Sequence, residues 1–139
     1  MSVHDKSVVV DAPVHKVFEM WSNFEDFPQF MSHIKEVRMM ESDKSHWKAN
    51  IAGIDEEWDA KTTKMDQDKE IAWESISGVQ NSGDIRFESV KGGTRINVHI
   101  EYEPPAGFVG KAVDAVYVGK DFDKDLQQDL NKFKETVES

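Results

Sequence analysis

The sequence contains no cysteine among its 139 residues, and it has no long run of apolar residues. Without a thiol, the chain cannot form a disulfide, a thiolate metal site or a cysteine nucleophile, and it suits a reducing compartment. No apolar stretch approaches the roughly 20 residues that a membrane-spanning helix needs. Residues 1–10 also lack the basic segment followed by an apolar run that is typical of a signal peptide. We therefore expect a cytoplasmic protein with no integral membrane association.

Basic residues are also scarce, since 17 Lys and Arg face 27 Asp and Glu and give a net charge of −10. Nucleic acids and anionic membrane surfaces are polyanions, so this balance argues against nucleic acid as a partner. Hydrophobic residues make up 38% of the chain and charged residues 32%, which fits a folded globular protein. We expect residues 1–139 to form a single domain. The oligomeric state stays open.

The C-terminal stretch has the clearest pattern in the chain. Its apolar residues are separated by steps of four, four, three and four, which places them on one stripe of an α-helix. Nearly all residues between them are polar or charged. This pattern predicts a long amphipathic helix from Phe122 onward, with its stripe formed by Phe122, Leu126, Leu130, Phe133 and Val137.

The middle of the chain alternates apolar and polar residues with the period of two that is typical of strands with one buried face. We predict a first strand around 8–10 and later strands at 36–41, 45–52, 56–65, 70–76, 84–90 and 94–103, with a loop at 77–83. Lys91, Gly92 and Gly93 form a hairpin signal because glycine supplies the positive φ of such turns. Short helices are predicted at 13–23, 24–31 and 106–118.

Together these patterns predict an α+β fold. A curved antiparallel sheet of about seven strands would wrap around the long C-terminal helix, and two short helices would follow the first strand. This arrangement is the helix-grip plan. The functional question is whether the sheet and the helix close tightly or leave a cavity between them.

Three tryptophans, Trp47, Trp58 and Trp73, fall at inward positions of three successive predicted strands. They could simply pack the core, because each large ring buries about 150–250 Å². Alternatively, some of them could line a cavity and stack on a flat ligand. Inward hydroxyl groups support the second interpretation, since a buried hydroxyl costs free energy unless it is hydrogen-bonded. The full candidate ligand-binding set is Trp47, Trp58, Thr62, Trp73, Ser75, Phe87, Val98, Tyr102, Phe108, Phe122 and Leu126.

Motifs for a catalytic or metal centre are not evident. None of the histidines has a metal-like spacing, and we expect all of them on the surface: His4, His15, His33, His46 and His99. The acidic group at 55–59 lacks the pattern of a calcium loop, and alternation divides it between two faces of a strand. We interpret it as a solvated hairpin. We therefore predict no catalytic set, no metal and no cofactor.

The chain resembles the polyketide cyclase/dehydrase group of the START-like (SRPBCC, helix-grip) superfamily. The resemblance covers nearly the whole chain and rests on short motifs at 8–13, 17–31, 46–47, 57–60, 71–73, 81–83, 102–105 and 129–134. It implies a cavity between the sheet and the last helix that accepts an apolar or aromatic molecule such as a lipid, a quinone or a polyketide-like compound. Fold alone does not give the activity.

Three functions remain open from the sequence. The first is a binding or carrier protein for a hydrophobic small molecule. The second is a cyclase- or dehydratase-type enzyme, in which Tyr102 or Thr62 would orient a polyketide-like chain. The third is a protein that acts on a partner through its surface, which a cavity too small for a ligand, beside an exposed apolar patch, would favour. A buried titratable residue with a perturbed pKa would support the enzyme.

Overall fold

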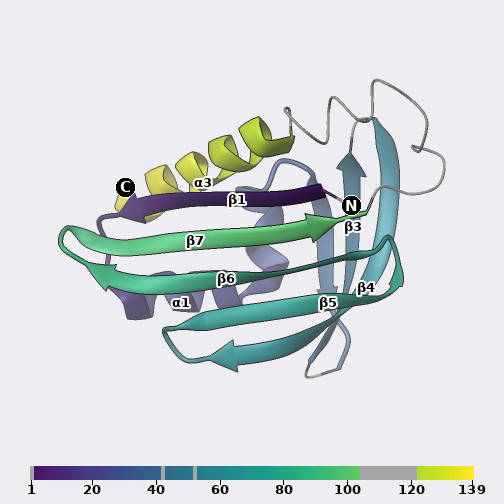
Figure 1. Cartoon of the computed structure of the whole chain (residues 1–139), viewed down its shortest axis with the longest axis horizontal. Helices are drawn as coiled ribbons and strands as arrows, with labels where there is room; N and C mark the ends of the chain where they lie inside the picture. The colour runs from purple at the N-terminus through teal and green to yellow at the C-terminus, as the bar shows by residue number, and fades with distance from the viewer. Residues whose placement is uncertain (1, 42, 52, 104–121) are drawn as a thin grey trace.

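The computed structural model describes residues 2–41, 43–51, 53–103 and 122–139. In chain order, the elements are β1 (Ser2–Val10), α1 (Val14–Ser22), the 3-10 helix η1 (Phe24–Gln29), β2 (Ile34–Met39), β3 (Lys44–Ile51), β4 (Ile54–Asp66), β5 (Glu70–Gly78), β6 (Asn81–Val90), β7 (Gly93–Tyr102) and α3 (Phe122–Glu138). The strands of the described residues form one seven-stranded sheet in the order β1-β7-β6-β5-β4-β3-β2, and all neighbours are antiparallel (Figure 1).

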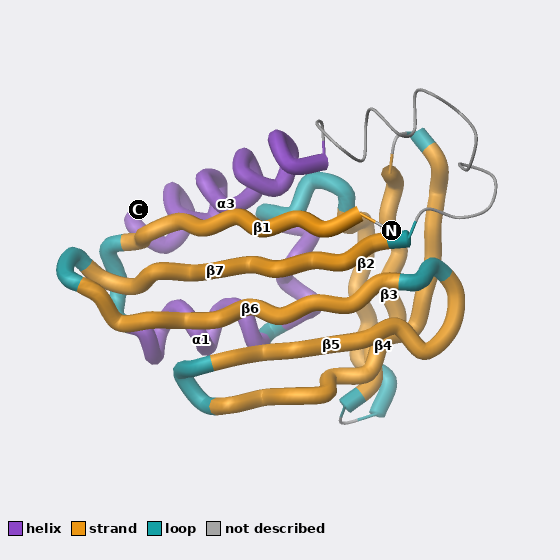
Figure 2. The backbone as a smooth tube through the Cα atoms, viewed as in Figure 1, coloured by secondary structure: helices purple, strands orange, loops and turns teal. Residues whose placement is uncertain are grey.

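The sheet curls strongly along its length. Figure 2 shows β1, β7 and β6 running across the molecule, whereas β2 and β3 run nearly upright at one end. Helix α3 lies beside β1, and α1 lies behind the sheet (Figure 1). This curled antiparallel sheet with a long C-terminal helix confirms the predicted helix-grip fold.

The apolar stripe of α3 is buried as its spacing predicts. Leu126, Leu130, Phe133 and Val137 are all at most 5% exposed. The ring of Phe133 lies 5.1 Å from the ring of Trp21 in α1 and 5.1 Å from that of Phe30, which follows η1. The helix is therefore fixed against both the sheet and the two short helices.

The predicted hairpin at Lys91–Gly93 is confirmed by the turn between β6 and β7. Gly92 has φ +93° and Gly93 has φ +133°. A Cβ atom on Gly93 would lie 2.0 Å from the carbonyl oxygen of Val10. Glycine is therefore required here both by the turn and by the close approach of β1 to the start of β7.

The predicted loop at 77–83 is wrong, because β5 and β6 extend into it and leave only Val79 and Gln80 between them. Gly83 suggested a loop, but it lies within β6 opposite Trp73. A Cβ atom at Gly83 would be 2.8 Å from the Trp73 ring, so this glycine makes room for the indole. Strand β2 begins at Ile34, two residues earlier than predicted. The predicted helix at 106–118 lies outside the described residues.

Two histidines on the outer face of the sheet contact carboxylates. His46 Nδ1 lies 2.6 Å from Asp59 Oδ1, and His99 Nδ1 lies 2.6 Å from Asp5 Oδ1. The hydrogen bond with Asp59 is the main reason that the pKa of His46 is raised above 6.5, and Asp5 acts in the same way on the pKa of His99. The protonated form of each imidazole is thus favoured in the folded state.

Replacing Phe133 by alanine should lower the free energy of unfolding by roughly 3–5 kcal/mol, as for other buried aromatic residues. The loss has two causes, the removed apolar surface and the cavity left among Trp21, Phe30 and the sheet. A denaturant melt measures it, with Lys132→Ala on the exposed face of α3 as the control. Equal stability of the two variants would show that the sheet does not hold the helix stripe.

Stability should fall as the pH rises above about 6.5, the usual pKa of a histidine side chain. Because the pKa of His46 and that of His99 are raised in the folded state, the stability that their protonated rings contribute is complete below 6.5 and is lost as the pH passes through the higher folded values. Urea unfolding between about pH 6 and pH 8 should show a larger loss for the natural protein than for the double variant His46→Gln/His99→Gln. The exposed His15→Gln serves as a control, and an identical pH dependence in all three proteins would contradict the assignment.

Candidate functional site

A cavity of about 110 Å³ lies on the inner side of the curled sheet, under the N-terminal half of α3. Its lining comes from α1, η1, the strands β2 to β7 and α3, so elements from both ends of the chain form it. The lining includes eight residues of the predicted set: Trp47, Trp58, Thr62, Trp73, Val98, Tyr102, Phe122 and Leu126.

Three residues of the predicted set are not among the lining residues. The side chain of Phe87 packs against Phe18 of α1, with ring centroids 5.4 Å apart. The hydroxyl of Ser75 accepts a hydrogen bond from the backbone N–H of Asn81 at 3.0 Å, so it helps to position the lining residue Asn81. Phe108 lies outside the described residues.

Aromatic rings form one wall of the cavity. Trp47 and Trp58 occupy directly paired positions on β3 and β4, and their rings stack at 6.0 Å with an angle of only 6° between the planes. Phe24 and Phe27 of η1 pack on Trp47 at 6.0 and 5.5 Å. The two interpretations of the tryptophans are thus compatible, since the same rings pack against neighbours and face the cavity.

The polar groups of two lining tryptophans are already hydrogen-bonded. Trp47 Nε1 donates to Ser45 Oγ at 2.7 Å, and Trp73 Nε1 donates to Asn81 Oδ1 at 3.0 Å. The amide of Asn81 in turn donates to the carbonyl of Val79 at 3.1 Å. These contacts fix the ring orientations and satisfy N–H groups that would otherwise be costly to bury.

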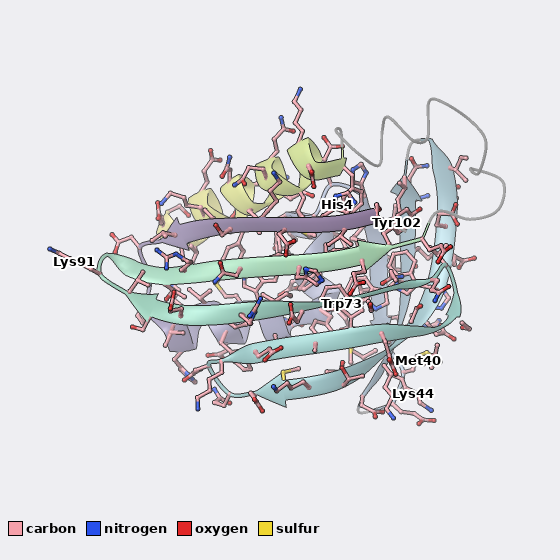
Figure 3. All side chains as sticks on the ribbon, viewed as in Figure 1. His4, Met40, Lys44, Trp73, Lys91 and Tyr102 are labelled. Carbon is pink, nitrogen blue, oxygen red and sulfur yellow. The ribbon has the colours of Figure 1, made fainter. Side chains whose placement is uncertain are left out.

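The prediction that all histidines lie on the surface is wrong for His4, which is 2% exposed. Its Nδ1 lies 2.6 Å from Asp123 Oδ1, and its Nε2 lies 2.9 Å from Ser2 Oγ. Because the Ser2 hydroxyl donates to the carbonyl of Tyr102, its oxygen must accept from His4. Both imidazole nitrogens then face acceptors, Asp123 Oδ1 and Ser2 Oγ. Figure 3 shows His4 and Tyr102 at the same end of β1 and β7.

His33 lines the cavity and was likewise missed by sequence reasoning. Its Nδ1 donates to the backbone carbonyl of Asn50 at 3.1 Å, and its Nε2 lies 2.9 Å from Asp125 Oδ2. The pattern of acceptors on both nitrogens is the same as at His4. Two histidines from different parts of the chain therefore hold the first turn of α3 through Asp123 and Asp125.

The ring of Phe122 lies among these groups at the start of α3. Its centroid is 4.4 Å from the His4 ring and 6.2 Å from the His33 ring. The Tyr102 ring stacks on it at 5.9 Å with an angle of 15° between the planes. Because Phe122 also lines the cavity, the histidine–aspartate contacts position part of the cavity wall.

Asp129 is the acidic residue that the predicted set lacks. It is 6% exposed, lines the cavity and lies within the apolar stripe of α3. Burial raises its pKa, whereas hydrogen bonds from Ser32 oppose this rise. Its position could have been noticed, because it lies three residues after Leu126 and four before Phe133, on the face that the stripe defines.

The acidic residues at 55–59, unlike Asp129, do not contribute to the cavity. Asp55 and Glu57 lie on the β3–β4 hairpin with side chains 72% and 59% exposed, in agreement with a solvated hairpin. Within the described residues, no group of three or more His, Cys, Asp or Glu side chains could hold a metal ion. None of the described helices is long and apolar enough to cross a membrane.

The sequence over residues 10–131 matches the family described as polyketide cyclase/dehydrase and lipid transport. The chain belongs to this family. The description joins cyclase and lipid-transport roles, so membership supports a role with hydrophobic molecules without assigning a specific function.

The chain is similar to an uncharacterized 17.2 kDa protein of Streptomyces lincolnensis. It is 28% identical over 140 residues, which span 99% of this chain and 91% of that protein. A crystal structure from Deinococcus radiodurans has a TM-score of 0.80 at 24% identity, with 99% and 98% of the two chains covered.

Two further structures extend the comparison of the fold. A START superfamily protein from Mycobacterium smegmatis has a TM-score of 0.78 at 15% identity, with 97% and 98% covered. An aromatase/cyclase from a Streptomyces species has a TM-score of 0.72 at 14% identity, with 98% and 90% covered. These likenesses show that the chain shares the helix-grip fold of these proteins.

Replacing Asp123 by alanine should destabilise the protein by roughly 1.5–3 kcal/mol, the range for a hydrogen bond to a charged group. The reason is that the buried imidazole of His4 would lose its acceptor. Urea unfolding tests this prediction, with Gln128→Ala on the exposed face of the same helix as the control. A stability equal to that of the control would mean that the contact contributes nothing.

Proposed function

We propose that this protein binds a hydrophobic small molecule with a flat or aromatic part in the cavity between the sheet and α3. The observation that carries the proposal is the lining itself, an aromatic and aliphatic wall with a few polar side chains held in fixed hydrogen bonds. Sites for apolar ligands have this composition, because the apolar wall supplies affinity and a few polar groups fix orientation.

The size of the cavity limits what it can hold in this conformation. At about 110 Å³ it suits a single aromatic ring or a short segment of a larger molecule, since an engineered apolar cavity of about 150 Å³ binds benzene. Leaving a cavity of this volume empty costs about 2–3 kcal/mol at roughly 24 cal/mol per Å³. An apolar occupant would recover part of that free energy.

The family supports the same proposal at a coarser level. Both roles in its description, the conversion of polyketides and the transport of lipids, require a site for hydrophobic molecules. We propose a lipid, quinone or polyketide-like ligand as the range to be searched. Carrying the ligand without chemical change is our first choice.

Native mass spectrometry of the freshly purified protein tests this function directly. We expect an additional mass of a few hundred daltons that disappears when the same sample is denatured. That mass would also define the chemical class of the ligand. A protein that carries no extra mass and binds no compound from a panel of lipids, quinones and aromatic polyketides would contradict the proposal.

A bound aromatic ligand should quench the fluorescence of the lining tryptophans. The conservative variant Trp58→Phe should reduce both the quenching and the affinity, because Trp58 faces the cavity and stacks on Trp47. Phe87→Leu provides a matched control, since Phe87 is buried in the same core but is not among the lining residues. Unchanged binding by Trp58→Phe would remove this ring from the site.

One observation favours an enzyme as the second candidate. Asp129 is the buried titratable group with a raised pKa that catalysis of the cyclase or dehydratase type would use. Its carboxylate could accept a proton from a carbon next to a ketone and return it to a departing hydroxyl, which would leave as water. A polyketide-like β-hydroxy ketone that loses water during incubation with the natural protein, but not with Asp129→Asn, would favour the enzyme over the carrier.

The third function, action on a partner through the surface, has less support. It required a cavity too small for a ligand beside an exposed apolar patch, whereas the cavity of about 110 Å³ has room for a single aromatic ring. The exposed large apolar side chains of the described residues are distributed over several elements: Val3, Val9, Met39, Met40, Ile54, Met65 and Ile76.

A further inference from the structure

The carboxyl group of Asp129 is placed inside an otherwise apolar part of α3. Leu126, Leu130 and Phe133 surround it on the helix face that packs inward. A carboxylate in such surroundings is costly unless donors reach it. The structure shows donors on one side, because the backbone N–H and the hydroxyl of Ser32 hydrogen-bond to Asp129.

These two donors do not occupy all the acceptor sites of the Asp129 carboxylate. Its two oxygens offer about four lone-pair sites, so acceptor capacity remains on a group that lines the cavity. Three other polar residues of the lining already have hydrogen-bond partners. Trp47 and Trp73 donate to neighbouring side chains, and both nitrogens of His33 contact acceptors. Asp129 therefore has unused capacity to accept a hydrogen bond from a ligand.

An unused donor is found in the same cavity. The indole Nε1 of Trp21 is buried and has no hydrogen-bond partner among the described residues, although Trp21 lines the cavity. The Trp21 ring lies 5.1 Å from the ring of Phe133. Phe133 follows Asp129 by one helical turn, so the two side chains lie next to each other on α3. The acceptor Asp129 and the donor Trp21 therefore line the same aromatic cavity, and each is a neighbour of Phe133.

We propose that this part of the cavity recognises the hydroxyl group of a neutral aromatic ligand, a phenol, and excludes carboxylates. The ligand hydroxyl would donate its proton to Asp129, and its oxygen would accept from Trp21 Nε1. This assignment rests on the proposed function, because it specifies the ligand class of the same cavity. Such a site would distinguish phenolic compounds from fatty acids and other anions. A purely apolar cavity would not make this distinction.

The exclusion of carboxylates follows from the charges around the cavity. The described lining residues include no Lys or Arg, and the imidazole of His33 is paired with Asp125. A bound carboxylate would therefore face Asp129 without a free cation nearby. Two carboxylates sharing a site with a low dielectric constant cannot both ionise without a large cost, so one must take up a proton.

Three probes of one shape separate these possibilities: toluene, 4-methylphenol and 4-methylbenzoate. Each carries a single ring, the size that the cavity accommodates, and they differ only in the group opposite the methyl. Binding is measured near neutral pH from the shifts of the indole N–H signals of the four tryptophans in ¹H–¹⁵N spectra. We expect 4-methylphenol to bind about ten-fold or more tightly than toluene, as one well-made hydrogen bond allows, and 4-methylbenzoate not to bind.

Asp129→Asn tests the role of the charge with almost no change of shape. We expect the preference for 4-methylphenol over toluene to shrink and 4-methylbenzoate to begin to bind. Glu135→Gln removes the same charge from the exposed face of α3 and should change neither result. If Asp129→Asn does not fold, the order of the three probes on the natural protein still decides the question.

Each outcome has a distinct meaning. Equal binding of all three probes, or a phenol preference that persists unchanged in Asp129→Asn, would overturn this inference and leave the proposed function standing. Binding of none of the probes, together with an empty native mass spectrum, would overturn the proposed function itself. If the expected order of affinities is found, is lost in Asp129→Asn and is kept in Glu135→Gln, it would support both this inference and the proposed function.

Discussion

The packing of α3 into the curled sheet is the interaction on which the rest of this structure depends. The C-terminal half of the helix fills its share of the core, with Phe133 fully buried against Trp21 and Phe30. The N-terminal half lies over the cavity, which Phe122, Leu126 and Asp129 line. One helix thus serves two purposes along its length, and the cavity lies where the fit between helix and sheet is incomplete. Any change in the position of α3 therefore changes the shape of the cavity.

Electrostatic contacts hold the first turn of α3, which apolar packing alone does not fix. The first turn of α3 carries Asp123 and Asp125, acidic residues that favour a helix N-terminus. Each meets a histidine from a distant part of the chain, His4 in β1 and His33 before β2. The two contacts hold the start of the helix from two sides, so Phe122 is positioned between them. Both histidine–aspartate contacts therefore lie where this part of the cavity wall is held in place.

Periodicity predicted the fold, since the strand alternation and the stripe of α3 depend on local rules. It also identified lining residues such as Trp58 and Tyr102, because inward positions of a curled sheet face whatever the sheet encloses. It did not predict His4 or His33. Both depend on partners about a hundred residues away, and a lone histidine carries no periodic signal. The extension of β6 through Gly83 was missed for the same reason, because the Trp73 ring that requires the glycine is on another strand.

Asp129 breaks the pattern of its own helix, and that is the strongest reason to connect it with function. A leucine at this position would continue the stripe, cover more apolar surface and avoid burying a carboxyl group. Residues that violate the local pattern without a structural gain concentrate at functional sites, where the cost is retained for another reason. Ser32 partly offsets that cost from the protein side. The remaining acceptor capacity points into the cavity region, and a donor on the ligand is what would make this buried carboxylate favourable.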